Sequence, residues 1–430
     1  MIADRTTLRE LRSLAQNDGF VRLFCGRIVT NLGDSLYFVA VMWLVFELTG
    51  STFYTGFAGV LVRGPQALRF LVGPLVDRLS FRRALVAPQV AQAGVVCIVP
   101  FAAVYGRLSV VVVLVVIPLV SLVGQLDDPA QNAAVPRVVG GELLTQANSV
   151  YAFVSRSTRS LSTALSGLLV AAIGAVSMYV LDAVTFLVAA LLFGTIGFTG
   201  ADESSGSDKS VHENGASSGS YAAELRDGFA LVTASIVAPM VLGAALGSLL
   251  IGVSYAVLPA YADRLGDATT YGLLLGAVSA GMLVGSAVAT VVEDHPFGRV
   301  TIGAFALAGL FWLAGVILSD RIGTVVLFAL AWLPIGAYNV LVLSTVQTGV
   351  PDEYLGRVMA TAGSANGLAY PLGALLGGVL GEWMSTPVVL SLGGVGFLGV
   401  SAYWLIQPAL RTFRPTTAVE PGSFDVDSGG

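Results

Sequence analysis

Residues 108–127 read LSVVVVLVVIPLVSLVGQLD, and only the final residue, Asp127, is charged. An α-helix needs about 20 consecutive apolar residues to cross about 30 Å of hydrocarbon. Comparable runs recur along the chain, near residues 20–46, 52–74, 82–104, 146–172, 175–198, 229–258, 270–292, 299–319, 322–346, 355–381 and 386–407. The sequence therefore predicts an all-α integral membrane protein with about twelve transmembrane helices.

The composition of the chain agrees with this class and excludes others. The 430 residues are 55% hydrophobic and 11% charged, whereas soluble domains carry about 25% charged residues. The net charge of −5 offers no basic stripe for nucleic acid. Cys25 and Cys97 lie within apolar runs, and His212 and His295 lie in separate hydrophilic segments. We therefore expect no nucleic-acid partner, no cofactor and no metal site.

The positions of the arginines set the expected orientation. With the N-terminus in the cytoplasm, the predicted outer loops contain only Arg107, Arg264 and Arg321, whereas the other loop arginines and Lys209 lie inside. Basic residues collect on the cytoplasmic side of membrane proteins. We expect a multi-pass protein of the cell membrane with both termini in the cytoplasm.

Two similar halves are joined by a hydrophilic segment. The predicted organisation is a cytoplasmic N-terminus (1–19), a six-helix bundle (20–198), a cytoplasmic linker (199–225), a second six-helix bundle (226–407) and a cytoplasmic tail (408–430). A shift of 216 residues aligns Tyr54–Gly56 with Thr270–Gly272, and Arg83 with Arg299. Such a match favours duplication of a six-helix unit.

A short loop after the second predicted span, residues 73–83, reads GPLVDRLSFRR. This loop resembles the signature of the major facilitator superfamily, and the matching residues are Gly73, Asp77, Arg78, Arg82 and Arg83. Other stretches resemble the branch of macrolide-efflux proteins and the enterobactin exporter, namely Asn31–Asp34, Glu47–Ser51, Leu181–Phe186, Gln347–Pro351 and Gly356–Val358. One departure is Ser162–Gly167, where antiporters of this superfamily often carry a Gly-Pro-x-x-Gly-Gly stretch.

The resemblance implies a major facilitator fold and a carrier rather than an enzyme. Two six-helix bundles would open alternately to each side of the lipid bilayer, with a small-molecule substrate held between them. The branch implies a proton-coupled exporter, an antiporter, of hydrophobic or amphiphilic molecules such as drugs or macrolides. Two alternatives stay open: export or flipping of an anionic substrate (a siderophore or a lysophospholipid), and a non-transporting sensor or assembly protein. The oligomeric state is not encoded in any motif, and a monomer is the default expectation.

Ionisable side chains inside spans are costly and are therefore functional candidates. Arg27, Asn31, Asp34 and Phe38 follow at helical spacing on one face of the first span, which we expect to face the cavity. Asp34 and Arg63 are expected at matching depth in neighbouring antiparallel spans. We expect Asp34, together with Arg63, Arg27 and Asn31, to couple protons or to bind a substrate amine. The alternative is that Asp34 only neutralises Arg63.

A second group of embedded charges, Asp127, Asp128, Arg156 and Arg159, is expected near the cytoplasmic ends of the spans. We expect these residues to form a cytoplasmic gate. The alternative is an anion site, because arginine suits carboxylate and phosphate oxygens. The family resemblance further implies that Asp77 meets the positive end of a helix from the other half and locks one conformation.

Polar and aromatic side chains of the second half are candidates for lining the cavity. These are Tyr255, Tyr338, Asn339, Asn366 and Tyr370. Aromatic rings can stack on a hydrophobic or ring-bearing substrate. The alternative for each residue is ordinary helix packing.

Overall fold

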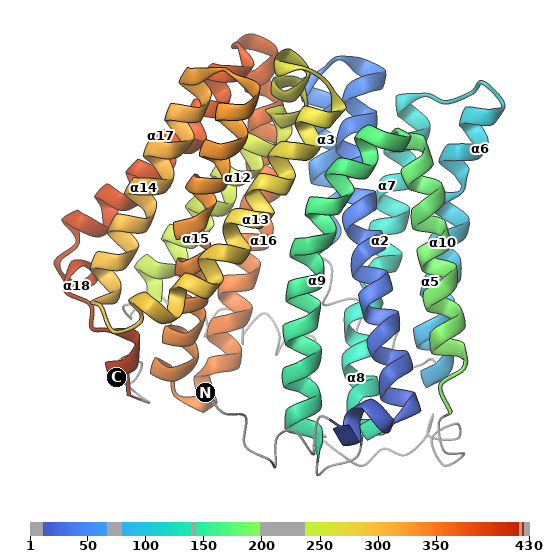
Figure 1. Cartoon of the computed structure of the whole chain (residues 1–430), viewed down its shortest axis with the longest axis horizontal. Coiled ribbons are helices and arrows are strands. Elements are labelled where there is room, and N and C mark those ends of the chain that lie inside the picture. The colour runs from blue at the N-terminus through green and yellow to red at the C-terminus, as the bar shows by residue number, and fades with distance from the viewer. Residues whose placement is uncertain (1–11, 67–79, 140–142, 198–236, 421–423, 425–430) are drawn as a thin grey trace, which may run out of the picture. The chain divides into compact units, whose positions relative to one another are not determined.

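The computed structural model describes residues 12–66, 80–139, 143–197, 237–420 and 424. These residues form α-helices joined by short connections, with no strand element among them. Figure 1 shows the helices as long, roughly aligned rods within each part of the molecule. The predicted all-α class is confirmed.

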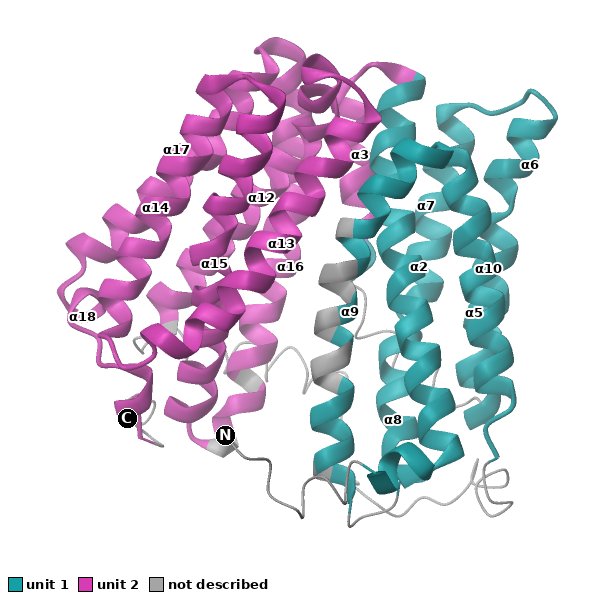
Figure 2. Cartoon of the chain, in the orientation of Figure 1, with its two compact units in different colours: residues 1–48, 65–211 teal, residues 49–64, 212–430 magenta. Residues whose placement is uncertain are grey.

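The helices divide into two compact units (Figure 2). Unit 1 comprises residues 1–48 and 65–211, and unit 2 comprises residues 49–64 and 212–430. One short helix that precedes the signature loop thus belongs to unit 2 by its contacts. The bundle boundaries that the sequence suggests stay a prediction.

Unit 1 contains the helices that correspond to the first through the sixth predicted spans, apart from the short helix before the signature loop. They are α2 (Asp18–Thr49), α5 (Phe81–Val96), α6 (Ile98–Val104), α7 (Val110–Gly124), α8 (Asp127–Val139), α9 (Leu144–Ile173) and α10 (Ala175–Gly194). Within this unit α5 packs against α7, α8 and α10, and α8 also contacts α9. The contacts of α8 place its first turn beside α5.

Unit 2 contains the short helix and the later spans. Its helices are α3 (Thr52–Arg63), α12 (Val237–Leu265), α13 (Ala268–Val292), α14 (Phe297–Leu318), α15 (Arg321–Gly349), α16 (Asp352–Trp383), α17 (Thr386–Ile406) and α18 (Pro408–Arg411), followed by the 3₁₀ turn η3 (Thr416–Ala418). The closest helix pairs are α13 with α15, α12 with α16, and α14 with α17. The short helix α3 packs on α16 and α12.

Helix starts repeat between the two halves at the shift found in the sequence. Helices α3 and α13 begin at Thr52 and Ala268, and α5 and α14 begin at Phe81 and Phe297, in each case 216 residues apart. The residues before α3 and α13 are also equivalent, because Ser51 and Asp267 each accept a hydrogen bond from a backbone N–H of the first turn. Such side-chain caps satisfy donors that have no partner inside the helix.

The structure differs from the fourth predicted span at the C-terminal end of that span. The apolar run ends at Asp127, but a turn at Gln125 and Leu126 is followed by a further helix, α8, through Val139. Helix α8 is polar on average, and it is held by a buried face that includes Ala130, Ala134 and Val135. Hydropathy alone does not detect such a helix, because packing rather than an apolar run fixes it.

Close approach of two helices in unit 2 depends on glycine. A Cβ atom at Gly56 of α3 would overlap the carbonyl oxygen of Ala374 in α16. A Cβ atom at Gly378 would lie 2.8 Å from the carbonyl oxygen of Thr52. The hydroxyl group of Thr52 donates a hydrogen bond to the Gly378 carbonyl oxygen at 3.0 Å. Small residues therefore let α3 and α16 touch backbone to backbone, as is common in membranes.

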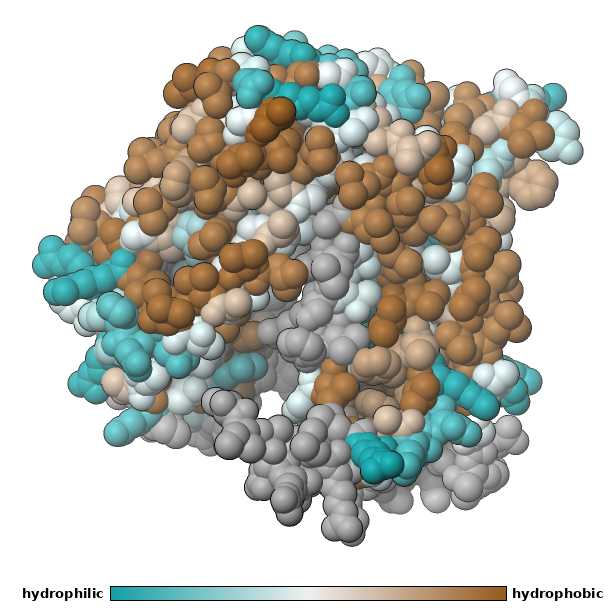
Figure 3. Space-filling model, viewed as in Figure 1, coloured by the Kyte–Doolittle hydropathy of each residue, from teal (hydrophilic) through white to brown (hydrophobic). Residues whose placement is uncertain are grey.

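The surface of the helices suits a lipid environment. Large apolar side chains are exposed on the flanks, among them Leu191 at 70%, Val291 at 72% and Ile317 at 79%. Figure 3 shows hydrophobic residues along the helices and hydrophilic residues gathered at helix ends on the face in view. Nine helical segments among the described residues are long and apolar enough to cross a membrane. Exposed apolar flanks of this extent are expected where lipid, not water, is the solvent.

Candidate functional site

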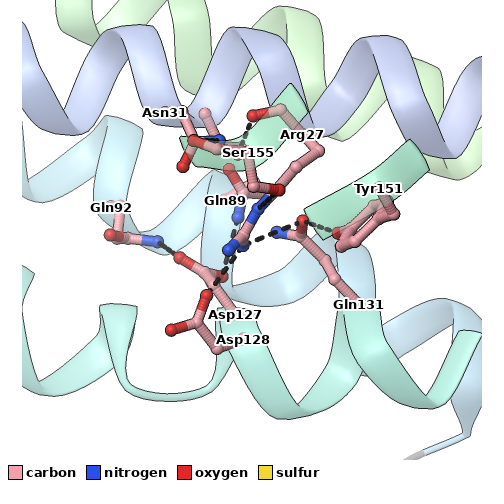
Figure 4. Close-up of polar contacts among 10 residues, drawn as sticks. Arg27, Asn31, Gln89, Gln92, Asp127, Asp128, Gln131, Tyr151 and Ser155 are labelled. Carbon is pink, nitrogen blue, oxygen red and sulfur yellow. Dashed lines mark hydrogen bonds and ion pairs between the residues drawn. The ribbon is translucent and has the colours of Figure 1, made fainter. Parts of the chain in front are cut away.

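A network of polar side chains lies inside unit 1, at the junction of four helices (Figure 4). It contains Arg27 and Asn31 of α2, Gln89 and Gln92 of α5, Asp127, Asp128 and Gln131 of α8, and Tyr151 and Ser155 of α9. Four of these residues, Arg27, Asn31, Asp127 and Asp128, are candidates named from the sequence. The structure brings all four into one cluster.

The guanidinium group of Arg27 is the centre of this network. Its Nη1 atom lies 2.7 Å from Oδ1 of Asp128, and the two side chains are 12% and 32% exposed. The same nitrogen donates to Oε1 of Gln131 at 3.3 Å, and Nε donates to Oγ of Ser155 at 3.2 Å. Arg27 lies nine residues into α2, or about 14 Å along a helix about 48 Å long. The ion pair is therefore inside the span rather than at its end.

Helix α9 contributes an aromatic ring that lies beside Arg27. The ring of Tyr151 lies 5.6 Å from the Cζ atom of Arg27, within cation–π range. The hydroxyl group of Tyr151 donates to Oε1 of Gln131 at 2.8 Å. Nδ2 of Asn31 points to the backbone oxygen of Ser155 at 3.5 Å. These contacts hold α2, α8 and α9 in one register.

Asp127 is adjacent to Asp128 in sequence but has different partners. Nε2 of Gln89 donates to Oδ1 of Asp127 at 2.7 Å, and Nε2 of Gln92 donates to Oδ2 at 2.9 Å. Both glutamines are buried on α5. Asp127 is also the first residue of α8, where the positive end of the helix dipole favours a carboxylate. The two neighbouring aspartates therefore lie in different environments, one with amides and one with a guanidinium group.

Sequence reasoning did not single out Gln89, Gln92, Gln131, Tyr151 or Ser155. A signal for the first two exists, because Gln89 and Gln92 are spaced by three residues within an otherwise apolar run and so share a helix face. Neutral polar residues in spans are less costly than charges. Their role becomes visible only when Asp127 is placed opposite them.

A second cluster lies in unit 2 and contains three of the cavity candidates. The rings of Tyr255 and Tyr370 meet edge to face, with centroids 6.4 Å apart. The Cζ atom of Arg63 lies 5.9 Å from the Tyr370 ring centroid, and Asn366 accepts a hydrogen bond from Ser248 at 2.9 Å. This cluster presents aromatic faces, an amide and a cation close together.

The remaining candidates are distributed differently. Tyr338 is buried between Phe297 and Phe305, as expected for packing, and Asn339 is exposed. On α2, Asp34 is exposed and Phe38 is partly buried. Asp34 belongs to unit 1 and Arg63 to unit 2, and their pairing stays a prediction.

Several gate candidates fall outside the described part of the structure. Gly73, Asp77 and Arg78 lie outside the described residues, and α9 contains Arg156 and Arg159, whose side chains are not described. Arg82 donates to the carbonyl oxygen of Gly194, and Arg83 is exposed. The gate role of this loop stays a prediction. Among the described residues, no group of His, Cys, Asp and Glu could hold a metal ion.

Comparisons with known proteins agree with the arrangement of long apolar helices. The sequence profile of the transmembrane secretion effector family matches residues 12–420. Macrolide efflux protein A of Streptococcus pyogenes is 23% identical over 372 residues, covering 84% of this chain and 89% of that protein. The enterobactin exporter EntS of Escherichia coli is 27% identical over 422 residues, covering 95% and 96%. A solved structure of the peptide transporter POT has a TM-score of 0.66 at 13% identity, covering 92% and 95% of the two chains, which indicates a shared fold.

Proposed function

We propose that this chain, which belongs to the transmembrane secretion effector family of the major facilitator superfamily, exports hydrophobic or amphiphilic small molecules in exchange for protons. Membership makes the chain a multi-pass membrane transporter of the efflux branch and not an enzyme. Two of its relatives are a macrolide efflux protein and an enterobactin exporter. Export of a small organic molecule is the activity that those relatives have in common.

The observation that carries proton coupling is the polar network of unit 1. Two carboxyl groups, Asp127 and Asp128, lie within one candidate membrane span, Val110–Val139. Ionisable groups inside spans are costly, up to about 2.5–3.5 kcal/mol each at the centre of a helix on insertion scales, so they are functional candidates. A carboxyl group that gains and loses a proton as the carrier alternates would link the substrate to the proton gradient.

Reconstituted vesicles with an imposed pH gradient test this proposal. The full chain would be given a panel of cationic, neutral and anionic amphiphiles while a pH-sensitive dye reports protons. Substrate-dependent proton movement supports a coupled exporter and identifies the preferred charge. Substrate accumulation that does not depend on the pH gradient, or ligand binding without any transport, would contradict the proposal. Labelling of single cysteines introduced near each end of the chain tests the proposed cytoplasmic location of both termini.

Export of an anionic amphiphile is a second candidate, favoured by the cluster of unit 2. Arg63 lies over the ring of Tyr370, with Tyr255 beside it. A guanidinium group binds carboxylate or phosphate oxygens, and the rings offer stacking surfaces. Preference for the anionic members of the panel, lost in Arg63→Gln, supports this candidate. An unchanged preference in that variant refutes it.

A further inference from the structure

Asp127 and Asp128 differ in how their charge is balanced. Asp128 forms an ion pair with Arg27 at 2.7 Å, whereas Asp127 accepts hydrogen bonds from the neutral amides of Gln89 and Gln92. An amide donor lowers the energy of a carboxylate but cancels no charge. A bound proton would remove the charge of Asp127 and leave the Arg27–Asp128 pair intact. The network therefore contains one balanced carboxylate and one that a proton can neutralise.

The two glutamines are not equivalent. Nε2 of Gln92 donates to Oδ2 of Asp127 and also approaches the carbonyl oxygen of Pro88 at 3.3 Å. A backbone carbonyl can only accept, so this second contact fixes the Gln92 amide with its nitrogen toward Asp127. Gln92 is therefore a donor in every protonation state of the carboxyl group.

Gln89 has the freedom that Gln92 lacks. Its side chain is 0% exposed, and within the described part of the chain its Oε1 atom has no hydrogen-bond partner. The oxygen and nitrogen of an amide have nearly the same size and shape. A half-turn of this amide would place Oε1 against Oδ1 of Asp127 without breaking any other hydrogen bond of the Gln89 side chain. Gln89 can therefore either donate to the carboxylate or accept from the carboxylic acid.

Both protonation states of Asp127 are satisfied by this arrangement. In the ionised state, Gln89 donates to Oδ1 and Gln92 donates to Oδ2. When a proton binds Oδ1, the new O–H group donates to the turned Gln89 amide, while Gln92 still donates to Oδ2. Only one proton and one amide rotation separate the two states. A polar group that is shielded from water is penalised when it lacks a partner. Asp127 is partly buried, and it has partners in both protonation states.

The groups that face Asp127 act in opposite directions. Arg27 of α2 favours the ionised form, and Asp34 of α2 and Asp128 of α8 favour the neutral form. Tyr151 of α9 also faces the carboxyl group, and α5 contributes the two amides. The first turn of α8 favours the ionised form through the helix dipole. A group under such opposing influences can change its protonation when the surrounding helices move.

We infer that Asp127 is the carboxyl group that carries the coupled proton, with Gln89 as its two-way partner and Gln92 as its fixed donor. This inference rests on the proposed proton-coupled export. Gln89 and Gln92 are positioning residues that act through Asp127. Asp182 of α10 has a fully buried carboxyl group, which accepts a hydrogen bond from the Thr185 hydroxyl group at 3.4 Å. It provides a control in the same unit.

The test uses the full chain in vesicles, with a transported amphiphile from the panel described above. For exchange of one proton per substrate, a gradient of one pH unit supports about tenfold accumulation, since each tenfold step equals one pH unit of driving force. Asp127→Asn is expected to reduce this to about onefold and to abolish substrate-dependent proton movement, while downhill substrate movement continues. Asp182→Asn is expected to retain full accumulation.

A second readout separates positioning from structural damage. Gln92→Met removes a donor that favours the ionised carboxyl, so the midpoint of the pH profile of transport should move to higher pH. Gln89→Met removes a partner of both states, so its midpoint should move less. An unmoved midpoint in Gln92→Met overturns the inference, and this result is decisive even where Asp127→Asn does not fold.

The outcomes also distinguish a failure of the proposed function from a failure of the assignment of the proton to Asp127. Wild-type protein without proton movement refutes the proposed function itself. Proton-driven accumulation that persists in Asp127→Asn refutes the inference and leaves the proposed function standing. If coupling is lost in Asp34→Asn and kept in Asp127→Asn, the proton site is Asp34 instead.

Discussion

Replacing Asp128 by Asn removes the carboxylate that balances Arg27 and leaves its guanidinium group inside the helix bundle. The pair has an Nη1–Oδ1 distance of 2.7 Å, with side chains 12% and 32% exposed. Hydrogen bonds to charged groups contribute about 1.5–3 kcal/mol, and breaking a fully buried ion pair costs about 3–5 kcal/mol. Because Asp128 is partly hydrated, we expect Asp128→Asn to lower the free energy of unfolding by about 2–3 kcal/mol.

The reverse variant, Arg27→Met, leaves a carboxylate that can still reach water, so its cost should be about 2 kcal/mol. If the two residues stabilise the protein mainly through each other, the double variant loses little more than the larger single variant. The sum of the single effects would be about 4–5 kcal/mol, so the coupling energy should be about 2 kcal/mol. Ser155 and Gln131, which also bind Arg27, limit how complete this compensation is.

Reversible unfolding in lipid–detergent micelles, followed by tryptophan fluorescence, measures these free energies for the four proteins of the cycle. The chain provides a matched control in Arg321 and Asp267, whose nitrogen and oxygen lie 3.6 Å apart with side chains 38% and 58% exposed. Exposed pairs contribute less than about 1 kcal/mol, so the control cycle should show little coupling. Additive effects for Arg27 and Asp128 within about 0.5 kcal/mol would refute our account of the network.

Four other variants test different parts of the structure. Asp34→Asn removes only a titratable group, and because we assign the coupled proton to Asp127, this variant should keep substrate-dependent proton movement in vesicles. Loss of proton movement with substrate binding retained would assign that role to Asp34. Gly378→Ala places a Cβ atom 2.8 Å from the Thr52 carbonyl oxygen, which should lower the free energy of unfolding by about 1–3 kcal/mol. The control is Gly94→Ala, which should not destabilise the protein, because a Cβ atom there meets nothing within 4 Å. Thermal unfolding of both variants measures the difference. Glu382 lies just beyond the predicted span 355–381. Its carboxylate accepts hydrogen bonds from Ser51 at 2.7 Å and from the Phe53 backbone at 3.0 Å, and these bonds, that of Ser51 first, lower its pKa. Because the side chain is exposed, Glu382→Ala should cost only about 0.5–1 kcal/mol at neutral pH. That contribution should be complete above about pH 4.5 and fade as the pH falls further, and an equal cost at pH 3 and pH 7 would contradict it. Phe424 is 1% exposed and is stacked on Phe413 with ring centroids 5.7 Å apart, so it should anchor the tail. Phe424→Ala should therefore speed tryptic cleavage after Arg411, the last residue of α18, whereas Phe101→Ala, at a residue 62% exposed, should leave the cleavage rate unchanged.

Some helix boundaries were predicted well from sequence patterns, whereas others were not: α12 ends at Leu265, seven residues beyond the predicted span 229–258. The predicted span 270–292 corresponds to α13 (Ala268–Val292), and 386–407 corresponds to α17 (Thr386–Ile406). Hydrocarbon thickness sets the length of each apolar run, so the boundaries follow from composition. Helix α8 shows where this reasoning fails, because its polar residues are helical through packing against neighbours and not through hydropathy.

The candidate site was predicted only in part. Embedded charge drew attention to Arg27, Asp127 and Asp128, because charges inside a span are conspicuous. The assignment of Asp128 to Arg27, and of Asp127 to two glutamines, could not be read from adjacent positions in one sequence. Neighbouring residues of a helix point about 100° apart, so each aspartate meets a different helix.

The resemblance to the major facilitator superfamily, which rests on specific motifs, is what indicated a carrier. The sequence by itself determined that this protein is a helical membrane protein with two similar halves. Apolar runs of spanning length, few charges and a half-length repeat suffice for that conclusion, because each is a property of the chain alone. The tertiary structure decided which polar groups meet inside the bundle and that the fourth span continues beyond Asp127 as a second helix. Those outcomes depend on the rotation of each helix against its neighbours, which packing fixes between residues such as Gln89 and Asp127 that are distant in sequence.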